Sequence, residues 1–280
     1  MARYRYVIAD VFTDRPLTGN QLAVFTNASE LPEDRFQDIA REMNFSETVF
    51  VLPSEDDGHV RIRIFTPATE LPFAGHPTLG SAFVLAGPLQ LVEIRLETGA
   101  GTVPVQVERE GARIVFGWMT QPLPTVEPFD RVGELLEALG VEGSELPVEA
   151  YSNGPRHVFV RLESEDAVAR VAPDLGKLAK LGALGVSTFA GDGKRWKTRM
   201  FAPGLGVAED PATGSAAGPL AVHLVRHGAI EPDTEIEISQ GEEILRPSKL
   251  YARVGGTRES IESVEVGGQA VIVANGELQL

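Results

Sequence analysis

The sequence predicts a mixed α/β fold built from two similar halves, and three features indicate it. Alternating apolar and polar residues, typical of strands, dominate the first 118 residues. Two short apolar segments have the composition of buried helices. Several short sequence blocks occur twice along the chain. Because 280 residues are enough for two domains, we expect two α/β halves that face each other across a cleft.

The strands of the first half are predicted by their alternation. Val60, Ile62 and Ile64 alternate with Arg61 and Arg63, so the apolar side chains share one face of a strand. Three further segments show the same alternation and are separated by turns that contain glycine: residues 91–97, 102–108 and 113–118. The first half is therefore predicted to be mostly sheet.

Helices are predicted by a different spacing. Residues 32–43 place apolar side chains at i, i+3, i+4 and i+7, with a proline at the start and Asn44 as a left-handed stop. Residues 77–86 are apolar on nearly every face, which predicts a buried helix. A further helix over residues 132–139 stops at Gly140.

The segment 119–128 is predicted to be a linker between the halves. It contains three prolines, which remove backbone donors and fix φ, so it cannot join a helix or a central strand.

Repeated blocks indicate an internal duplication, with chance similarity between two strand–loop–helix units as the alternative. The matched blocks are residues 65–67 with 201–203, residues 76–82 with 210–216 and, more weakly, residues 48–51 with 157–160.

Composition excludes several classes of function. The chain has no cysteine, which rules out disulfides, thiolate metal sites and cysteine nucleophiles. A net charge of −15 disfavours nucleic acids and anionic membranes as partners. No apolar run approaches the roughly 20 residues that a spanning helix needs. We expect a soluble, cytoplasmic protein.

Each of the main repeated blocks ends a strand and opens a buried helix, the second over residues 216–226. Such helix ends carry unpaired N–H groups, and small residues leave this backbone open to a ligand carboxylate or a developing enolate. Plain capping is the alternative, with Asp210 as the N-cap acceptor and Pro211 at the first helical position.

Glu47 is a candidate general acid or base. It leads into an apolar strand, where burial favours a raised pKa. A solvated glutamate at a strand edge is the alternative.

No metal site is predicted. His223 and His227 stand at i, i+4 on a helix, but no third ligand is evident from the sequence. His59 and His157 are expected to be structural or exposed.

Six blocks of sequence resemble the PhzF-like phenazine biosynthesis family. In chain order they are residues 10–13, 19–24, 46–50, 65–67, 70–80 and 209–216. Because these blocks are long, ordered and spread over most of the chain, the resemblance covers the whole sequence. One departure is Gln21, where many relatives have proline.

The resemblance implies the diaminopimelate-epimerase-like fold, with two pseudo-symmetric halves that each wrap a curled, mostly antiparallel sheet around a central helix. One half would comprise residues 1–118 and C-terminal strands over about 264–280, and the other residues 129–263. It further implies a homodimer without a metal or organic cofactor. The epimerase relatives use two cysteines, which this chain lacks, so two-thiol epimerisation is excluded.

The family's type reaction isomerises trans-2,3-dihydro-3-hydroxyanthranilate by moving a ring proton. By resemblance, Glu47 would remove and return that proton, while His76 and Asp210 would orient the substrate. Ser215, with backbone N–H groups near Gly75 and Gly214, would hold the substrate carboxylate, and Thr213 would also bind the substrate.

Two other functions stay open at this point. One is a one-base epimerase or racemase of an amino or hydroxy acid derivative, although inversion usually needs acids or bases on both faces. The other is a non-catalytic metabolite-binding protein that keeps the fold.

Overall fold

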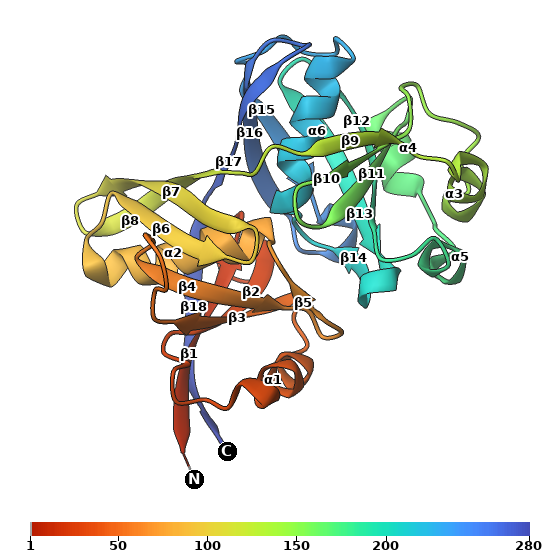
Figure 1. Cartoon of the computed structure of the whole chain (residues 1–280). Coiled ribbons are helices and arrows are strands. Elements are labelled where there is room, and N and C mark those ends of the chain that lie inside the picture. Colours follow the sequence, from red (N-terminus) through yellow and green to blue (C-terminus); the bar gives the residue numbers. More distant parts are fainter. Residues whose placement is uncertain (1) are drawn as a thin grey trace. The chain divides into compact units, whose positions relative to one another are not determined.

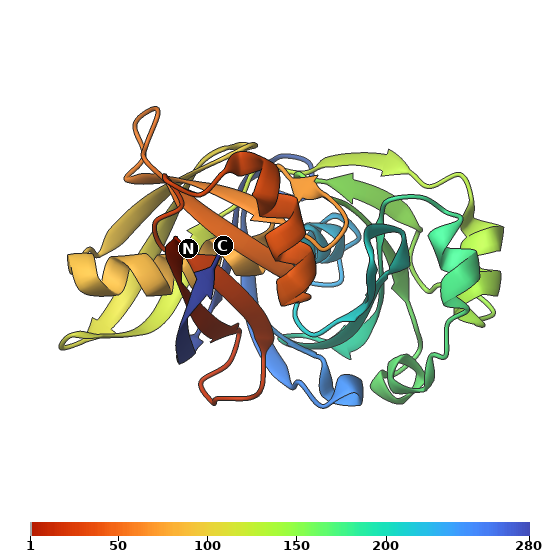
Figure 2. The same ribbon diagram turned by 90° about the horizontal axis from the view of Figure 1, so that it is seen from below.

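The structure is a computed structural model that describes residues 2–280 and divides into two units (Figures 1 and 2). The first unit holds the chain up to Thr120 together with Gly267–Leu280, and the second holds Gln121–Val266. The last strand, β18 (Ala270–Gln279), pairs antiparallel with β1 (Arg3–Val11), so both ends of the chain lie side by side in the first unit (Figure 2).

The first unit is mostly sheet, as alternation predicts. Its remaining elements are β2 (Asn20–Phe25), η1 (Glu33–Arg35), α1 (Phe36–Met43), β3 (Glu47–Leu52), β4 (Val60–Phe65), β5 (Glu70–Leu71), α2 (Gly75–Leu89), β6 (Glu93–Thr98), β7 (Gly101–Glu110) and β8 (Arg113–Thr120). The predicted strands correspond to β4, β6, β7 and β8. Asn44 ends α1 with a φ of 53°, as expected of a left-handed stop.

Helix α2 forms the core of this unit. Residues of α2 from Gly75 to Val84 are buried, and the helix contacts β1, β2, β3, β6, β7 and β8. The helix is longer than the predicted 77–86 at both ends. Its N-cap residue is Ala74, so Pro77 lies within the first turn, and at the other end the helix continues through Pro88 to Leu89. A separate cluster of stacked rings, including Phe36 and Phe50, holds α1 against β3.

The second unit contains the remaining elements. These are β9 (Thr125–Pro128), α3 (Val132–Leu139), β10 (Glu149–Ser152), β11 (Arg156–Arg161), α4 (Glu165–Arg170), α5 (Leu175–Ala179), β12 (Gly185–Asp192), β13 (Arg195–Ala202), η2 (Pro203–Leu205), β14 (Val207–Asp210), α6 (Gly214–Arg226), β15 (Ile236–Gln240), η3 (Glu242–Ile244), β16 (Ser248–Gly256) and β17 (Ile261–Gly268), whose last two residues belong to the first unit. Helix α6 is buried along its length except at Arg226.

Strand pairing supports the duplication more strongly than the sequence blocks do. In the first unit, β1 pairs antiparallel with β2, β2 parallel with β3, β3 antiparallel with β4, and β4 antiparallel with β5. Strand β4 also pairs parallel with β6, and β6 pairs antiparallel with β7. From β10 to β16 the same order of directions recurs, with α6 placed as α2 is. The two halves are therefore repeats of one unit.

The topology corrects two of the predicted block matches. By pairing order, β11 corresponds to β2, so the match of residues 48–51 with 157–160 is wrong and reflects only the apolar composition of both strands. The match of His76 with Asp210 is also out of register. His76 is the second residue of α2, a place that Ser215 holds in α6, whereas Asp210 ends β14.

The expected linker, residues 119–128, is shorter in the structure. Met119 and Thr120 complete β8, and Thr125–Pro128 form β9, which pairs with β10. A strand tolerates the proline here because Pro128 is its last residue, and Pro122 and Pro124 precede it. Among residues 2–280, no helix has the length and apolar character that crossing a bilayer requires.

Candidate active site

In the first unit, two side chains named from sequence come together. His76 is buried in the first turn of α2, and its Nδ1 atom lies 3.2 Å from Oε2 of Glu47, the first residue of β3. Because β2 and β3 run parallel, their first residues lie at the same edge of the sheet, and Asn20 of β2 joins the pair. Its Nδ2 atom is 3.2 Å from the same His76 nitrogen.

His76 is held as a neutral imidazole. Burial lowers its pKa to about 3, and the backbone of Gln21, which favours the charged ring, offsets only part of that effect. The carboxyl oxygen and the imidazole nitrogen are 3.2 Å apart, a separation that a proton on either atom can bridge once the donor is aligned with the acceptor. Glu47 and His76 therefore form a pair that can hold and pass a single proton.

The loop before β2 fixes the position of Asn20. Asp10 Oδ2 accepts a hydrogen bond of 2.7 Å from the backbone N–H of Leu17. Gly19, with a φ of 68°, lies so close to the Val11 carbonyl and the Thr13 side chain that no Cβ would fit. This requirement explains the glycine in the Gly19-Asn20 block.

In the second unit, Asp210 and Thr213 are joined at the start of α6. The hydroxyl of Thr213 donates a hydrogen bond of 2.6 Å to Oδ2 of Asp210. The buried side chain of Gln240 fixes this turn, since its Nε2 donates to the Asp210 carbonyl and its Oε1 accepts from the Thr213 N–H.

Asp210 does not cap α6, so the capping alternative is wrong. Thr213 is the N-cap residue, and neither it nor Ala74 at the start of α2 makes a side-chain capping bond. Asp210 lies too early, because the turn that follows it separates it from the first helical residue, Gly214. Both central helices thus begin with small residues and without a side-chain cap, which suits an anion.

Ser215 is paired with His157, which the sequence did not indicate as part of the site. Nε2 of His157 lies 3.1 Å from Oγ of Ser215, and both side chains are buried. Burial lowers the pKa of His157 to about 4, so the ring is neutral near pH 7. Within residues 2–280 its Nδ1 atom has no hydrogen-bond partner. An unbonded lone pair costs less than an unbonded N–H, so the proton belongs on Nε2, which donates to Ser215.

This tautomer leaves the Ser215 hydroxyl hydrogen available as a donor. The Ser215 carbonyl accepts from Asn153, and the Gly214 carbonyl accepts from Gln121, so the first turn of α6 is fixed as well. His157 was expected to be structural or exposed. The exposed alternative is wrong, because the side chain is buried, and it also touches a candidate substrate-binding hydroxyl. Only its place in the apolar strand β11 hinted at burial.

The residues named from sequence therefore form one group in each unit. The first unit brings together Glu47, Gly75 and His76. The second brings together Asp210, Thr213, Gly214 and Ser215. Asn20, His157 and Gln240 were missed as supporting residues. Asn20 lies in a block quoted for the resemblance, but its contact with His76 spans 56 residues of sequence.

Comparison with known proteins decides the family. The family profile described as "Phenazine biosynthesis-like protein" matches residues 9–276. The chain belongs to this phenazine biosynthesis-like family.

Its similar relatives are isomerases. The chain is 51% identical over 277 residues to the trans-2,3-dihydro-3-hydroxyanthranilate isomerase of Pseudomonas aeruginosa, covering 99% of this chain and 100% of that one. It is 48% identical to the Pseudomonas fluorescens enzyme of the same name, with the same coverage. This member of the phenazine biosynthesis-like family is an isomerase.

Solved structures agree on the fold. A phenazine biosynthesis protein of the PhzF family from Bacillus anthracis superposes with a TM-score of 0.86 at 26% identity, covering 100% of both chains. A hydroxyproline epimerase from Agrobacterium vitis superposes with a TM-score of 0.70 at 12% identity, over 99% of this chain and 91% of that one, and shares the fold.

Proposed function

We propose that this protein isomerises trans-2,3-dihydro-3-hydroxyanthranilate, with Glu47 as the acid/base that removes a ring proton and returns it at another carbon. The single observation that carries the proposal is the contact between Glu47 and the neutral, buried His76. The substrate follows from full-length relatives near 50% identity that bear this name.

A single carboxyl group is enough for this reaction. The proton leaves carbon as Glu47 takes it up, and Glu47 is restored when it delivers a proton to the second carbon, so no oxidant, reductant or metal is needed. His76 supports Glu47 in this cycle, because a neutral imidazole can share the proton without adding a fixed charge. Asn20 keeps the ring oriented.

We further propose that the second unit holds polar groups of the same substrate. Asp210, which Thr213 and Gln240 hold in place, would accept a hydrogen bond from the amino or hydroxyl group of the substrate. The hydroxyl of Ser215 and the N–H group at Gly214 would bind its carboxylate, because an uncapped helix start favours an anion. The N–H group at Gly75, at the uncapped start of α2, is an equivalent anion site within the first unit. The enzyme would act in the cytoplasm as a homodimer and without a cofactor. Light scattering after gel filtration would test the oligomeric state.

The deciding experiment follows the substrate by proton NMR in heavy water with wild type and Glu47→Gln. The variant should turn over about 100 to 10,000 times more slowly, since it has lost a general acid/base but keeps the size of the side chain. Deuterium in the product would show that the proton on Glu47 exchanges with solvent.

Glu108→Gln is the matched control, because Glu108 is exposed on β7 and loses the same charge. It should turn over as wild type does. A folded Glu47→Gln protein with wild-type turnover would refute the role of Glu47, and an inactive wild type would refute the substrate.

A further inference from the structure

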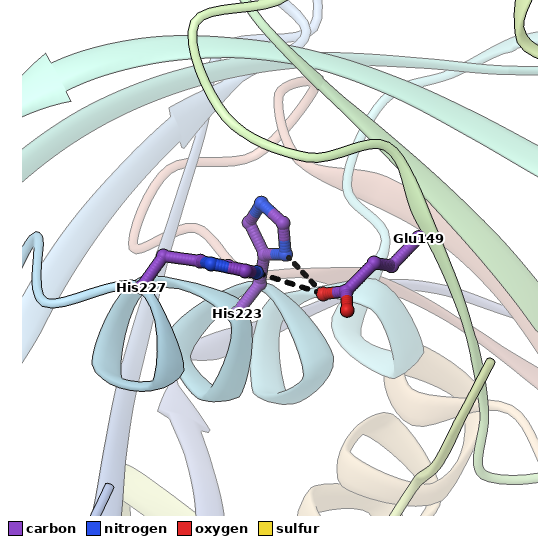
Figure 3. A group of neighbouring side chains, drawn as sticks. All are labelled: Glu149, His223 and His227. Atoms are coloured by element: carbon purple, nitrogen blue, oxygen red, sulfur yellow. Dashed lines mark hydrogen bonds and ion pairs between the residues drawn. The ribbon is translucent and has the colours of Figure 1, made fainter. Parts of the chain in front are cut away.

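One carboxylate and two imidazoles form a compact group in the second unit. Figure 3 shows Glu149 pointing toward His223 and His227 of α6. Oε2 of Glu149, which lies on β10, is 2.8 Å from Nε2 of His227 and 3.5 Å from Nδ1 of His223. The three donor atoms all lie within 4.8 Å of one another.

We propose that Glu149, His223 and His227 form a binding site for a first-row transition metal ion, with Zn²⁺ as its simplest occupant. Zinc takes imidazole and carboxylate ligands at about 2.0–2.2 Å, which in a tetrahedron separates neighbouring ligand atoms by roughly 3.3–3.5 Å. The 3.5 Å separation from His223 already matches this spacing, and the 2.8 Å separation from His227 would have to open by roughly half an ångström to admit the ion.

The two histidines are arranged as ligands on one face of the helix. Residues at i and i+4 lie one above the other, so both rings reach toward the same strand. His223 is buried against the rings of Phe159 and Tyr151. Its Nδ1 atom would bind an ion in the tautomer that carries the ring proton on Nε2.

Groups around the carboxylate orient it for this role. The Tyr151 hydroxyl donates a hydrogen bond of 2.9 Å to Oε2 of Glu149 and lies 3.0 Å from Nδ1 of His223. Such outer hydrogen bonds fix the direction of a ligating carboxylate. The Arg226 guanidinium lies 3.8 Å from the other oxygen, Oε1, and leaves Oε2 facing the imidazoles.

The site is open to solvent on one side and remote from the proposed chemistry. The side chains of His227 and Glu149 are 20% and 17% exposed, so an ion can enter past them, and a water can complete the coordination. His223 is eight residues beyond Ser215 on α6, which is about 12 Å along the helix axis. A bound ion would therefore fasten the end of α6 to β10 without taking part in the isomerisation.

The test is calorimetric titration of ZnCl₂ into the full-length, tag-free protein after treatment with EDTA. We expect one ion per chain with micromolar affinity. At 100 times the dissociation constant, the melting temperature should rise by roughly 5 °C. Mg²⁺ should give no such rise, because it prefers all-oxygen sites.

Variants decide whether the three side chains are the ligands. His227→Gln and Glu149→Gln should each weaken zinc binding at least tenfold. His59→Gln should bind as wild type does, because His59 is an exposed histidine of the first unit and controls for adventitious binding. The absence of saturable binding to wild type, or equal binding by His227→Gln and His59→Gln, would overturn the proposal.

Cobalt gives a readout that does not depend on any variant's folding. Co²⁺ added to wild type should produce the visible absorption of a four- or five-coordinate ion, and Zn²⁺ should displace it. A spectrum identical to that of Co²⁺ in water would overturn the proposal, and isomerase activity that is unchanged in EDTA would support a structural rather than a catalytic ion.

Discussion

The Ser215 hydroxyl depends on a neighbouring side chain for its direction. A serine oxygen that accepts from His157 Nε2 must point its own hydrogen elsewhere, and in the proposed function that hydrogen meets the substrate carboxylate. His157 is therefore a positioning residue, and it acts on the substrate only through Ser215.

Removing this donor should weaken substrate binding more than turnover. We expect His157→Phe, which fills the space but has no N–H, to lower kcat/KM about tenfold, mostly through KM. His157→Gln, whose amide can donate over a similar reach, should recover much of the loss. Steady-state kinetics of both variants provide the measurement.

A double-mutant cycle separates positioning from general structural damage. If His157 acts through Ser215, then His157→Phe should cause no further loss in a Ser215→Ala background. Additive losses in the double variant would contradict this role.

At the scale of single elements, helix α2 shows why a buried helix can require glycine. A Cβ at Gly80 would lie 2.6 Å from methyl groups of both Val11 and Leu22, so the helix packs on β1 and β2 only because that atom is absent. At Gly87 in the same helix, a Cβ would meet nothing within 4 Å.

Alanine at these two positions should have opposite effects. Gly80→Ala should destabilise the protein by about 1–3 kcal/mol through overpacking. Gly87→Ala should be neutral or stabilise it by up to about 1 kcal/mol, because alanine favours the helix and the space is open. Urea unfolding of both variants gives the comparison, and equal effects would contradict the packing explanation.

At the scale of the whole molecule, buried neutral histidines link stability to pH. The pKa of His157 is about 4 in the folded protein and about 6.5 in the unfolded chain, so the unfolded chain binds more protons between these values. This contribution is constant above pH 6.5, and stability falls as pH drops from 6.5 towards 4.

The pH dependence should be smaller without His157. Between pH 7 and pH 5, His157 should account for a fall of about 2 kcal/mol in the free energy of unfolding. The drop measured by urea unfolding should therefore be smaller by about that amount in His157→Gln. The other titrating groups are common to both proteins, so an identical drop would contradict the assignment of a neutral His157.

The sequence predicted the strands and helices well, because each is specified locally. Alternation identified β4, β6, β7 and β8, and Asn44 and Gly140 ended their helices in the left-handed conformation as expected. The family was also determined by sequence, since its blocks are contiguous and ordered.

Which distant residues meet became clear from the folded chain. The register of the repeat became visible from strand pairing, which showed that Ser215 rather than Asp210 takes the place of His76. His157 reaches Ser215 across 58 residues and Glu149 reaches His227 across 78, and no local pattern encodes such contacts. Sequence specifies short-range periodicity and turn chemistry, whereas contacts between distant residues arise when parallel strands and a buried helix bring their ends together.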